Sequence, residues 1–261
     1  MEDDLSIIFE PETQPLPVKD ETYDEIFAKA GITEELRRPG NYFLVEQAVE
    51  GVVELWPIPT EIVVDGASYE LRENGALIST QARVNSEAEV GSRSIVERGA
   101  NIYREVQIGS ACVIGAEAVL KEGVWLTNSV QIGARVVVHE GAYFNNHAVI
   151  GDDCIVGENS SVHAYSKVGD EVRIEDKVFI SSYVELGDYA FVGEGAQIDD
   201  HSLIGNSANI AKHSRIGRRV QVSAGVHTKE RQKIKDGSWV VSYAGRVVNN
   251  PPRKGTGESE A

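Results

Sequence analysis

Every sixth residue from Ile78 to Val222 is a large apolar residue, and the series has no break. The residue two positions before each of these is always Ala, Ser, Cys or Val, beginning with Ala76. Residues two apart point to the same side of an extended strand. The pattern therefore predicts short strands that each turn one large and one small side chain inward, with a turn between successive strands.

Strands this short cannot bury an apolar face alone, so they must be stacked in a solenoid. Three strands per coil of about 18 residues close a prism around one core and leave no lateral sheet edge. Gly often follows the large residue, as at Gly115 and Gly133, which fits a tight corner. We therefore expect an all-β solenoid, a parallel β-helix of about eight coils, over residues 76–228.

The repeat consists of an aliphatic residue, Gly, two variable residues, a small residue and one more. It resembles the repeat of the hexapeptide-repeat proteins with the left-handed β-helix fold, over roughly residues 76–228. The runs Ile234-Lys-Asp-Gly-Ser-Trp-Val-Val and Ala244-Gly-Arg-Val-Val are similar to the segment that closes such helices, which we place at 229–248. The resemblance implies a left-handed coil and a homotrimer.

The regions that flank the repeat have a different character. Residues 1–20 are acidic and contain proline, and we expect them to be flexible. Residues 21–75 are predicted to form a small α+β region that caps the first coil, with a helix from about Tyr23 and a hairpin around Asp65-Gly66. The tail 249–261 is predicted to be disordered.

Composition narrows the range of partners. The formal charge of −16 argues against nucleic acid or an anionic membrane surface, since both require Lys and Arg. No apolar run approaches the ~18 residues of a membrane-spanning helix, and the acidic start differs from a secretory signal. We therefore expect a cytoplasmic protein. Cys112 and Cys154 occupy small inward positions, so we interpret both as structural core residues.

With three strands per coil, every turn belongs to one of three corner columns, and one column is unusual. We call it the candidate corner. Gly is absent from it over five coils while Asn, His, Ser, Tyr and Asp accumulate, in the turns 127–129, 145–147, 163–165, 181–183 and 199–201. Because function often resides in special residues on a regular scaffold, we place a candidate site here. The alternative is that corners accept any polar residue and that stacked side chains aid packing.

Apolar side chains also recur at outward positions of the strands. One face carries Val119, Val137 and Ile155, and another carries Trp125, Tyr143 and Phe179. Exposed apolar stripes on a solenoid indicate subunit contact. A threefold arrangement would set a corner of one subunit against a face of the next and enclose a cleft.

Hexapeptide-repeat acyltransferases use such clefts to bind acyl-CoA along the coils, and a His deprotonates the acceptor amine or hydroxyl. Leu126-Thr-Asn and Phe144-Asn-Asn are similar to the Phe-Thr-Asn-Asp element of the sugar-nucleotide N-acetyltransferases. This resemblance implies an acyltransferase with acyl-CoA as co-substrate and a small-molecule acceptor, such as a sugar nucleotide.

The candidate corner supplies residues suited to this chemistry. His163 is the first candidate for the base and His147 the second, because a His needs only a modest shift in pKa to act as a base near neutral pH. Asn145 and Asn146 are candidates for holding a carbonyl or the developing oxyanion.

Two alternatives remain open. The runs Ile132–Phe144 and Val156–His163 are similar to segments of the γ-class carbonic anhydrases, which bind zinc through three His. The ligand positions of that family fall on Asn145, Glu158 and His163, and His163 keeps the ligand type. This resemblance implies a γ-carbonic-anhydrase-like protein with a degenerate zinc site. A non-catalytic β-helix scaffold is the other alternative, and the unbroken coils favour it.

Overall fold

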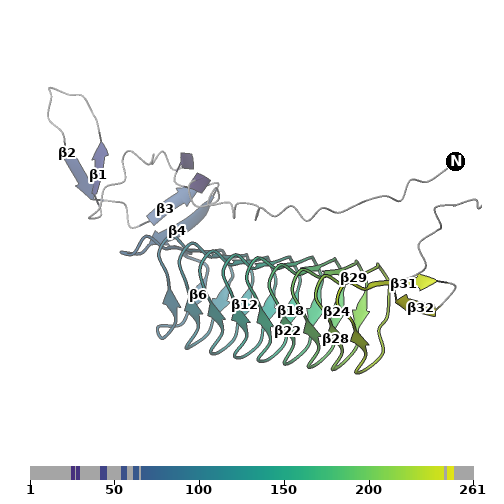
Figure 1. Ribbon diagram of the computed structural model, residues 1–261. Helices are drawn as coiled ribbons and strands as arrows, with labels where there is room; N and C mark the ends of the chain where they lie inside the picture. The colour runs from purple at the N-terminus through teal and green to yellow at the C-terminus, as the bar shows by residue number, and fades with distance from the viewer. Residues whose placement is uncertain are drawn as a thin grey trace, which may run out of the picture.

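The computed structural model describes residues 25–26, 28–29, 42–45, 54–57, 61–64, 66–243 and 246–249. Parallel strands wind into one long solenoid, and antiparallel strands adjoin it at both ends (Figure 1). The segments expected to be flexible or disordered, 1–20 and 249–261, lie outside the described residues, apart from Asn249.

Three sheets form the sides of the prism. The nine-stranded sheet comprises β7 (Glu89–Val90), β10 (Gln107–Ile108), β13 (Trp125–Leu126), β16 (Tyr143–Phe144), β19 (Ser161–Val162), β22 (Phe179–Ile180), β25 (Gln197–Ile198), β28 (Arg215–Ile216) and β30 (Lys233–Ile234). The eight-stranded sheet comprises β6 (Arg83–Val84), β9 (Asn101–Ile102), β12 (Val119–Leu120), β15 (Val137–Val138), β18 (Ile155–Val156), β21 (Arg173–Ile174), β24 (Phe191–Val192) and β27 (Asn209–Ile210).

The thirteen-stranded sheet includes the antiparallel strands at both ends. It comprises β3 (Glu61–Val64), β4 (Ala67–Leu71), β5 (Leu77–Ser79), β8 (Ile95–Val96), β11 (Val113–Ile114), β14 (Gln131–Ile132), β17 (Val149–Ile150), β20 (Lys167–Val168), β23 (Glu185–Leu186), β26 (Leu203–Ile204), β29 (Gln221–Val222), β31 (Trp239–Tyr243) and β32 (Arg246–Asn249). Two further strands, β1 (Tyr42–Val45) and β2 (Glu54–Pro57), form a separate antiparallel pair.

The pairing register confirms the predicted coil. Trp125 lies beside Tyr143, and Tyr143 lies beside Ser161, in parallel strands. Contacts between neighbouring coils therefore join residues 18 apart, as in the hydrogen bond from the Ser110 N–H to the Asn128 side chain. The all-β solenoid of parallel strands expected from the sequence is confirmed.

One continuous core runs through the coils from Ile78 to Val240. Within the strands, the first residue is mostly exposed or half-buried and the second is buried, as at Trp125 and Leu126. Each fully buried large side chain contributes roughly 1.5–3 kcal/mol through the hydrophobic effect. The repeated inward residue is therefore what holds successive coils together.

The small inward residues have a second task where they are Ser or Cys. The Ser166 hydroxyl donates to the carbonyl of Ser181 at 2.6 Å and accepts from the N–H of Val184 at 3.0 Å. The thiol of Cys154 donates to the carbonyl of Gly169 at 3.1 Å. Burial raises the pKa of Cys154 to about 11, and it does the same for Cys112. The thiolate, which is the reactive form, is therefore scarce at neutral pH, and both cysteines are structural.

The turns bring neighbouring coils very close together. A Cβ atom at Gly115 would lie 2.5 Å from the backbone carbon of Gly133, so this corner requires Gly. The outermost residue of most turns has a left-handed backbone, for example Tyr165 at φ 60°. Its N–H donates to the carbonyl of Asn146 in the preceding coil at 3.1 Å, which offsets part of the strain of about 1–2 kcal/mol.

The predicted hairpin around Gly66 is confirmed as β3 and β4, and β4 pairs antiparallel with β5. Its apolar side chains pack on Leu77 and Ile95, which point outward from the first coils and are fully buried. The Tyr69 hydroxyl donates to Glu97 at 2.8 Å. The hairpin thus packs on one side of the first coils and extends one edge of their sheet.

Regular coils continue past the boundary expected at residue 228. Lys233 pairs in parallel with Arg215, and Trp239 with Gln221. The segment that we assigned to closure therefore begins as another coil, and the antiparallel pair of β31 and β32 follows it. Among the described residues, no helix combines the length and the apolar character needed to cross a membrane.

Candidate functional site

The candidate corner joins the nine-stranded sheet to the thirteen-stranded sheet. Asn145 directly follows β16, and His163 directly follows β19. Because these strands pair in register, the two residues are neighbours along the corner, about one strand spacing of ~4.8 Å apart. The structure therefore brings Asn145 and His163 together.

The outermost residues of this corner form a ring ladder, defined as His147, Tyr165, Tyr183 and His201. Neighbouring rings are nearly parallel, with centroids 4.8, 5.2 and 4.9 Å apart and interplanar angles of 11°, 13° and 16°. Stacking hides the faces of the inner rings and leaves their edges outward. This is the stacking that the packing alternative describes, and it places the His147 ring in a packed column.

His163 belongs to a different group, the aromatic patch, defined as Trp125, Tyr143, His163 and Phe179. The His163 ring lies 4.7 Å from the Phe179 ring and 5.9 Å from the Tyr143 ring, between centroids. Tyr143 in turn makes an edge-to-face contact with Trp125, with ring centroids 5.4 Å apart. His163 therefore faces the nine-stranded sheet, whereas His147 stacks at the outer edge of the corner. The sequence could assign both residues to one corner but could not separate their directions.

The aromatic neighbours determine the charge state of His163. Burial lowers the pKa of the half-buried imidazole below its ordinary value of 6.5, and the Asp200 carboxylate opposes this shift. No hydrogen-bond partner of its ring nitrogens lies among the described residues. At neutral pH the ring is therefore uncharged, and a nitrogen lone pair is available to accept a proton.

Two substitutions should move the pKa of His163 in opposite directions. Phe179→Ala is expected to raise it toward 6.5 because the substitution exposes the ring to water, and Asp200→Asn is expected to lower it further because a favourable charge is lost. NMR titration of the imidazole signals measures both shifts, with His213→Gln identifying an unrelated resonance. A raised pKa in Asp200→Asn would contradict this electrostatic account.

Asn145 and Asn146 present hydrogen-bond donors at the same corner. The side-chain oxygen of Asn145 accepts the N–H of Asn146 at 2.7 Å. The side-chain oxygen of Asn146 accepts the N–H of Asn128 at 3.1 Å. Because both oxygens are occupied by backbone donors, both NH₂ groups point away from those contacts and can donate to a ligand oxygen.

The residues carried over from the carbonic anhydrases are not assembled within one chain. Glu158 lies in the turn before β19, whereas His163 lies in the turn after it. The described residues contain no group of three His, Cys, Asp or Glu side chains placed to hold a metal ion. The arrangement therefore does not support the zinc hypothesis of Asn145, Glu158 and His163.

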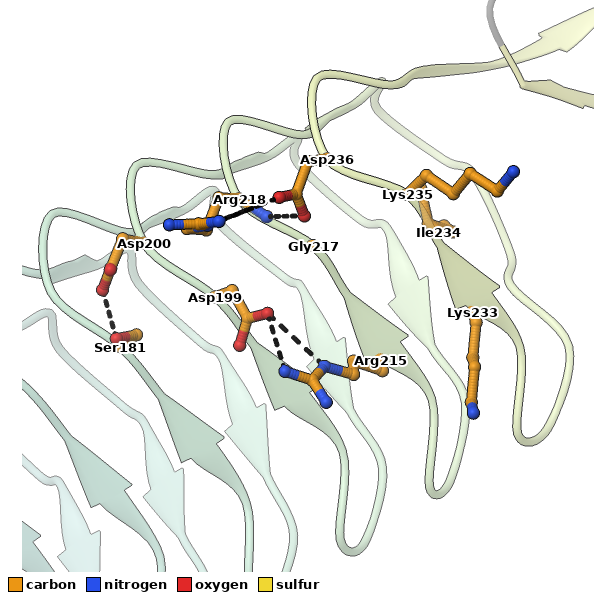
Figure 2. Close-up of a pocket in the computed structure, with 10 residues that line it drawn as sticks. All are labelled: Ser181, Asp199, Asp200, Arg215, Gly217, Arg218, Lys233, Ile234, Lys235 and Asp236. Atoms are coloured by element: carbon orange, nitrogen blue, oxygen red, sulfur yellow. Dashed lines mark hydrogen bonds and ion pairs between the residues drawn. The ribbon is translucent and has the colours of Figure 1, made fainter.

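A cleft that the sequence pattern did not predict lies farther along the candidate corner, and we call it the basic cleft (Figure 2). It has a volume of about 470 Å³ and is lined by Ser181, Asp199, Asp200, Arg215, Gly217, Arg218, Lys233, Ile234, Lys235 and Asp236. The sequence signal was available, because Arg215 and Lys233 occupy equivalent outward positions of successive strands.

The comparisons with known proteins concern the fold. Residues 73–188, less than half of the chain, match the family model of the GMPPB C-terminal domain. A search of curated proteins gave no significant match. LpxA from Acinetobacter baumannii has a TM-score of 0.60 at 11% sequence identity, over 66% of this chain and 73% of that one.

Two other solved structures are less similar. UDP-N-acetylglucosamine acyltransferase from Francisella novicida has a TM-score of 0.41 at 18% identity, over 66% of this chain and 69% of that one. A variant of perosamine N-acetyltransferase from Caulobacter crescentus, in complex with CoA and GDP-perosamine, has a TM-score of 0.38 at 21% identity, over 41% and 52%. Of these three likenesses, that to LpxA carries the argument, and it concerns the fold alone. The chain therefore shares the parallel β-helix fold of LpxA.

Proposed function

We propose that the protein is an acyltransferase that moves an acyl group from acyl-CoA to an amine or hydroxyl of a small molecule, such as a sugar nucleotide. The observation that carries this proposal is the environment of His163, an uncharged base held among aromatic rings beside amide donors. The resemblance to the hexapeptide-repeat acyltransferases, of which the structurally similar LpxA is one, supports the class of reaction.

The chemistry assigns one task to each side chain. A ring nitrogen of His163 accepts the proton of the acceptor as the acceptor attacks the thioester carbon. The NH₂ groups of Asn145 and Asn146 donate to the carbonyl oxygen as it becomes negatively charged. When the intermediate collapses, the carbon–sulfur bond breaks, and the His163 proton passes to the departing CoA thiolate. A carbon–nitrogen or carbon–oxygen bond has then replaced the thioester. His147, fixed in the ring ladder, is the second candidate for the base.

The same proposal includes assembly as a cytoplasmic homotrimer. Trp125 is 51% exposed and Ile155 is 40% exposed, on two different sides of the prism. Such side chains are typical of subunit contacts. A neighbouring subunit against the aromatic patch would enclose His163 and exclude water from the acyl group. Acyl-CoA is an intracellular metabolite, which is why we place the protein in the cytoplasm.

Binding and turnover of acetyl-CoA test the proposal. At a concentration 100 times its Kd, a ligand stabilises the folded state by about 2.7 kcal/mol, so the melting temperature should rise by several degrees. Release of the free CoA thiol in the presence of small amine and hydroxyl acceptors should follow, and acetate should give neither effect. If acetyl-CoA neither stabilises the protein nor is consumed with any acceptor, the non-catalytic scaffold is the better description.

A further inference from the structure

The basic cleft lies on the same side of the prism as His163 but several coils farther along. It is formed where β25, β28 and β30 meet the turns that follow them (Figure 2). We propose that this cleft binds the diphosphate group of a phosphorylated substrate. The inference rests on the proposed function only for the identity of that substrate; binding of diphosphate is an independent property of the cleft.

Charge is the first argument, because the cleft differs from the rest of this acidic chain. Each of its three carboxylates already has a partner: Asp199 pairs with Arg215, Asp236 pairs with Arg218, and Asp200 accepts from the Ser181 hydroxyl. Lys233 and Lys235 have no acidic partner among the described residues. With Arg215 and Arg218, the lining has four cations against three carboxylates, and neither ammonium group forms an ion pair within the described part of the chain.

The strand register places the unpaired Lys233 beside Arg215, whose pairing with Asp199 is long. Arg215 and Lys233 are direct neighbours in β28 and β30, and both are exposed at outward positions. Two like charges side by side on neighbouring strands destabilise a sheet. A ligand with several negative oxygens between them would turn this repulsion into attraction.

The arginines of the cleft also keep donors free. The contacts between Arg215 and Asp199 measure 3.3 and 3.4 Å, and the Arg218 side chain reaches Asp236 at 3.3 and 3.4 Å. By contrast, Arg135 holds Asp153 through two bonds of 2.6 Å elsewhere on the solenoid. A guanidinium has five N–H donors, so each loosely held arginine retains enough of them for a phosphate group.

The position of the cleft along the solenoid determines its distance from His163. Its basic residues lie three to four coils beyond His163, which corresponds to roughly 15–20 Å at one strand spacing per coil. A diphosphate bound here leaves the rest of its molecule free to extend along the candidate corner. Both a CoA donor and a sugar-nucleotide acceptor contain a diphosphate, so the chemistry of the cleft is the same for either source.

Titration calorimetry with inorganic pyrophosphate at low ionic strength tests the proposal. The protein should bind it, and the double variant Lys233→Gln/Lys235→Gln should bind at least roughly tenfold more weakly, because charge-assisted bonds are lost. Lys167→Gln, which removes an exposed cation from the thirteen-stranded sheet, is the matched control and should bind as the parent does. Binding should weaken as salt is added. Thermal unfolding shows whether each variant is folded.

Competition identifies the source of the diphosphate. Displacement of pyrophosphate by CoA assigns the cleft to the donor, and displacement by UDP or GDP assigns it to the acceptor. The proposal is overturned if pyrophosphate does not bind, if it binds the folded double variant unchanged, or if none of these nucleotides competes. His163→Gln should retain pyrophosphate binding, so failure of this inference can be distinguished from failure of the proposed acyl transfer.

Discussion

Replacing His163 with glutamine is expected to lower kcat for acyl transfer by roughly 10²–10⁴-fold, while the KM for acyl-CoA changes little. Glutamine keeps a polar side chain of similar reach between Tyr143 and Phe179, so the aromatic patch should remain packed. What glutamine cannot do is accept a proton near neutral pH. The loss should therefore appear in the chemical step rather than in binding, and steady-state kinetics of CoA release measures both.

The proposed role of His163 also predicts the direction in which activity changes with pH. The base must be uncharged to accept a proton, so kcat/KM should be maximal above the pKa of His163 and should fall as the pH decreases through it. Because burial lowers that pKa, the fall should occur below pH 6.5. The residual activity of His163→Gln should lack this acidic fall. His147→Gln is the comparison, and the proposal would be wrong if that variant lost the activity while His163→Gln retained it.

Truncation of Phe144 to alanine is expected to lower the free energy of unfolding by about 3–5 kcal/mol. Phe144 is the largest side chain that is fully buried in the solenoid, and its strand is paired with strands of the coils on both sides. Backbone hydrogen bonds fix those neighbouring coils at one strand spacing, so they cannot close around the cavity. Urea denaturation followed by circular dichroism measures the change through the midpoint of unfolding.

Val63→Ala provides the control for this truncation. Val63 is 60% exposed in the N-terminal hairpin, so its replacement should change stability by no more than about 0.5 kcal/mol. Equal losses in the two variants would show that the inward hexapeptide positions do not carry the stability of the solenoid.

The sequence predicts the fold well because one physical requirement repeats through it. Each strand must bury a large and a small side chain, so a large apolar residue occurs at every sixth position from Ile78 to Val222. The end of the coils was harder to predict. The run from Lys229 to Gly237 has few apolar residues, yet Ile234 is buried and continues the core. A single inward residue is sufficient once neighbouring coils supply the hydrogen bonds.

The candidate site was predictable only as a location. Loss of Gly marks the corner, and coil spacing makes Asn145 and His163 neighbours. The orientation of the side chains could not be predicted, because His147 stacks in the ring ladder whereas His163 packs in the aromatic patch. That difference follows from the position of each residue in its turn, because His147 has a left-handed backbone at φ 61°. The basic cleft depends on which carboxylates pair with which cations, and the repeat does not encode this pairing.

The constant register of the coils means that insertions and deletions affect the core and the candidate site differently. Gain or loss of one six-residue unit keeps every inward residue inward, so the chain still folds into a packed solenoid. All residues after that point, however, move to the next side of the prism. Only a change by a full coil of 18 residues restores them. Packing of the core thus requires only that insertions and deletions be multiples of six residues. Keeping His163 and Arg215 on the same side of the prism requires multiples of 18. A length change that leaves folding intact can therefore still separate the parts of the site.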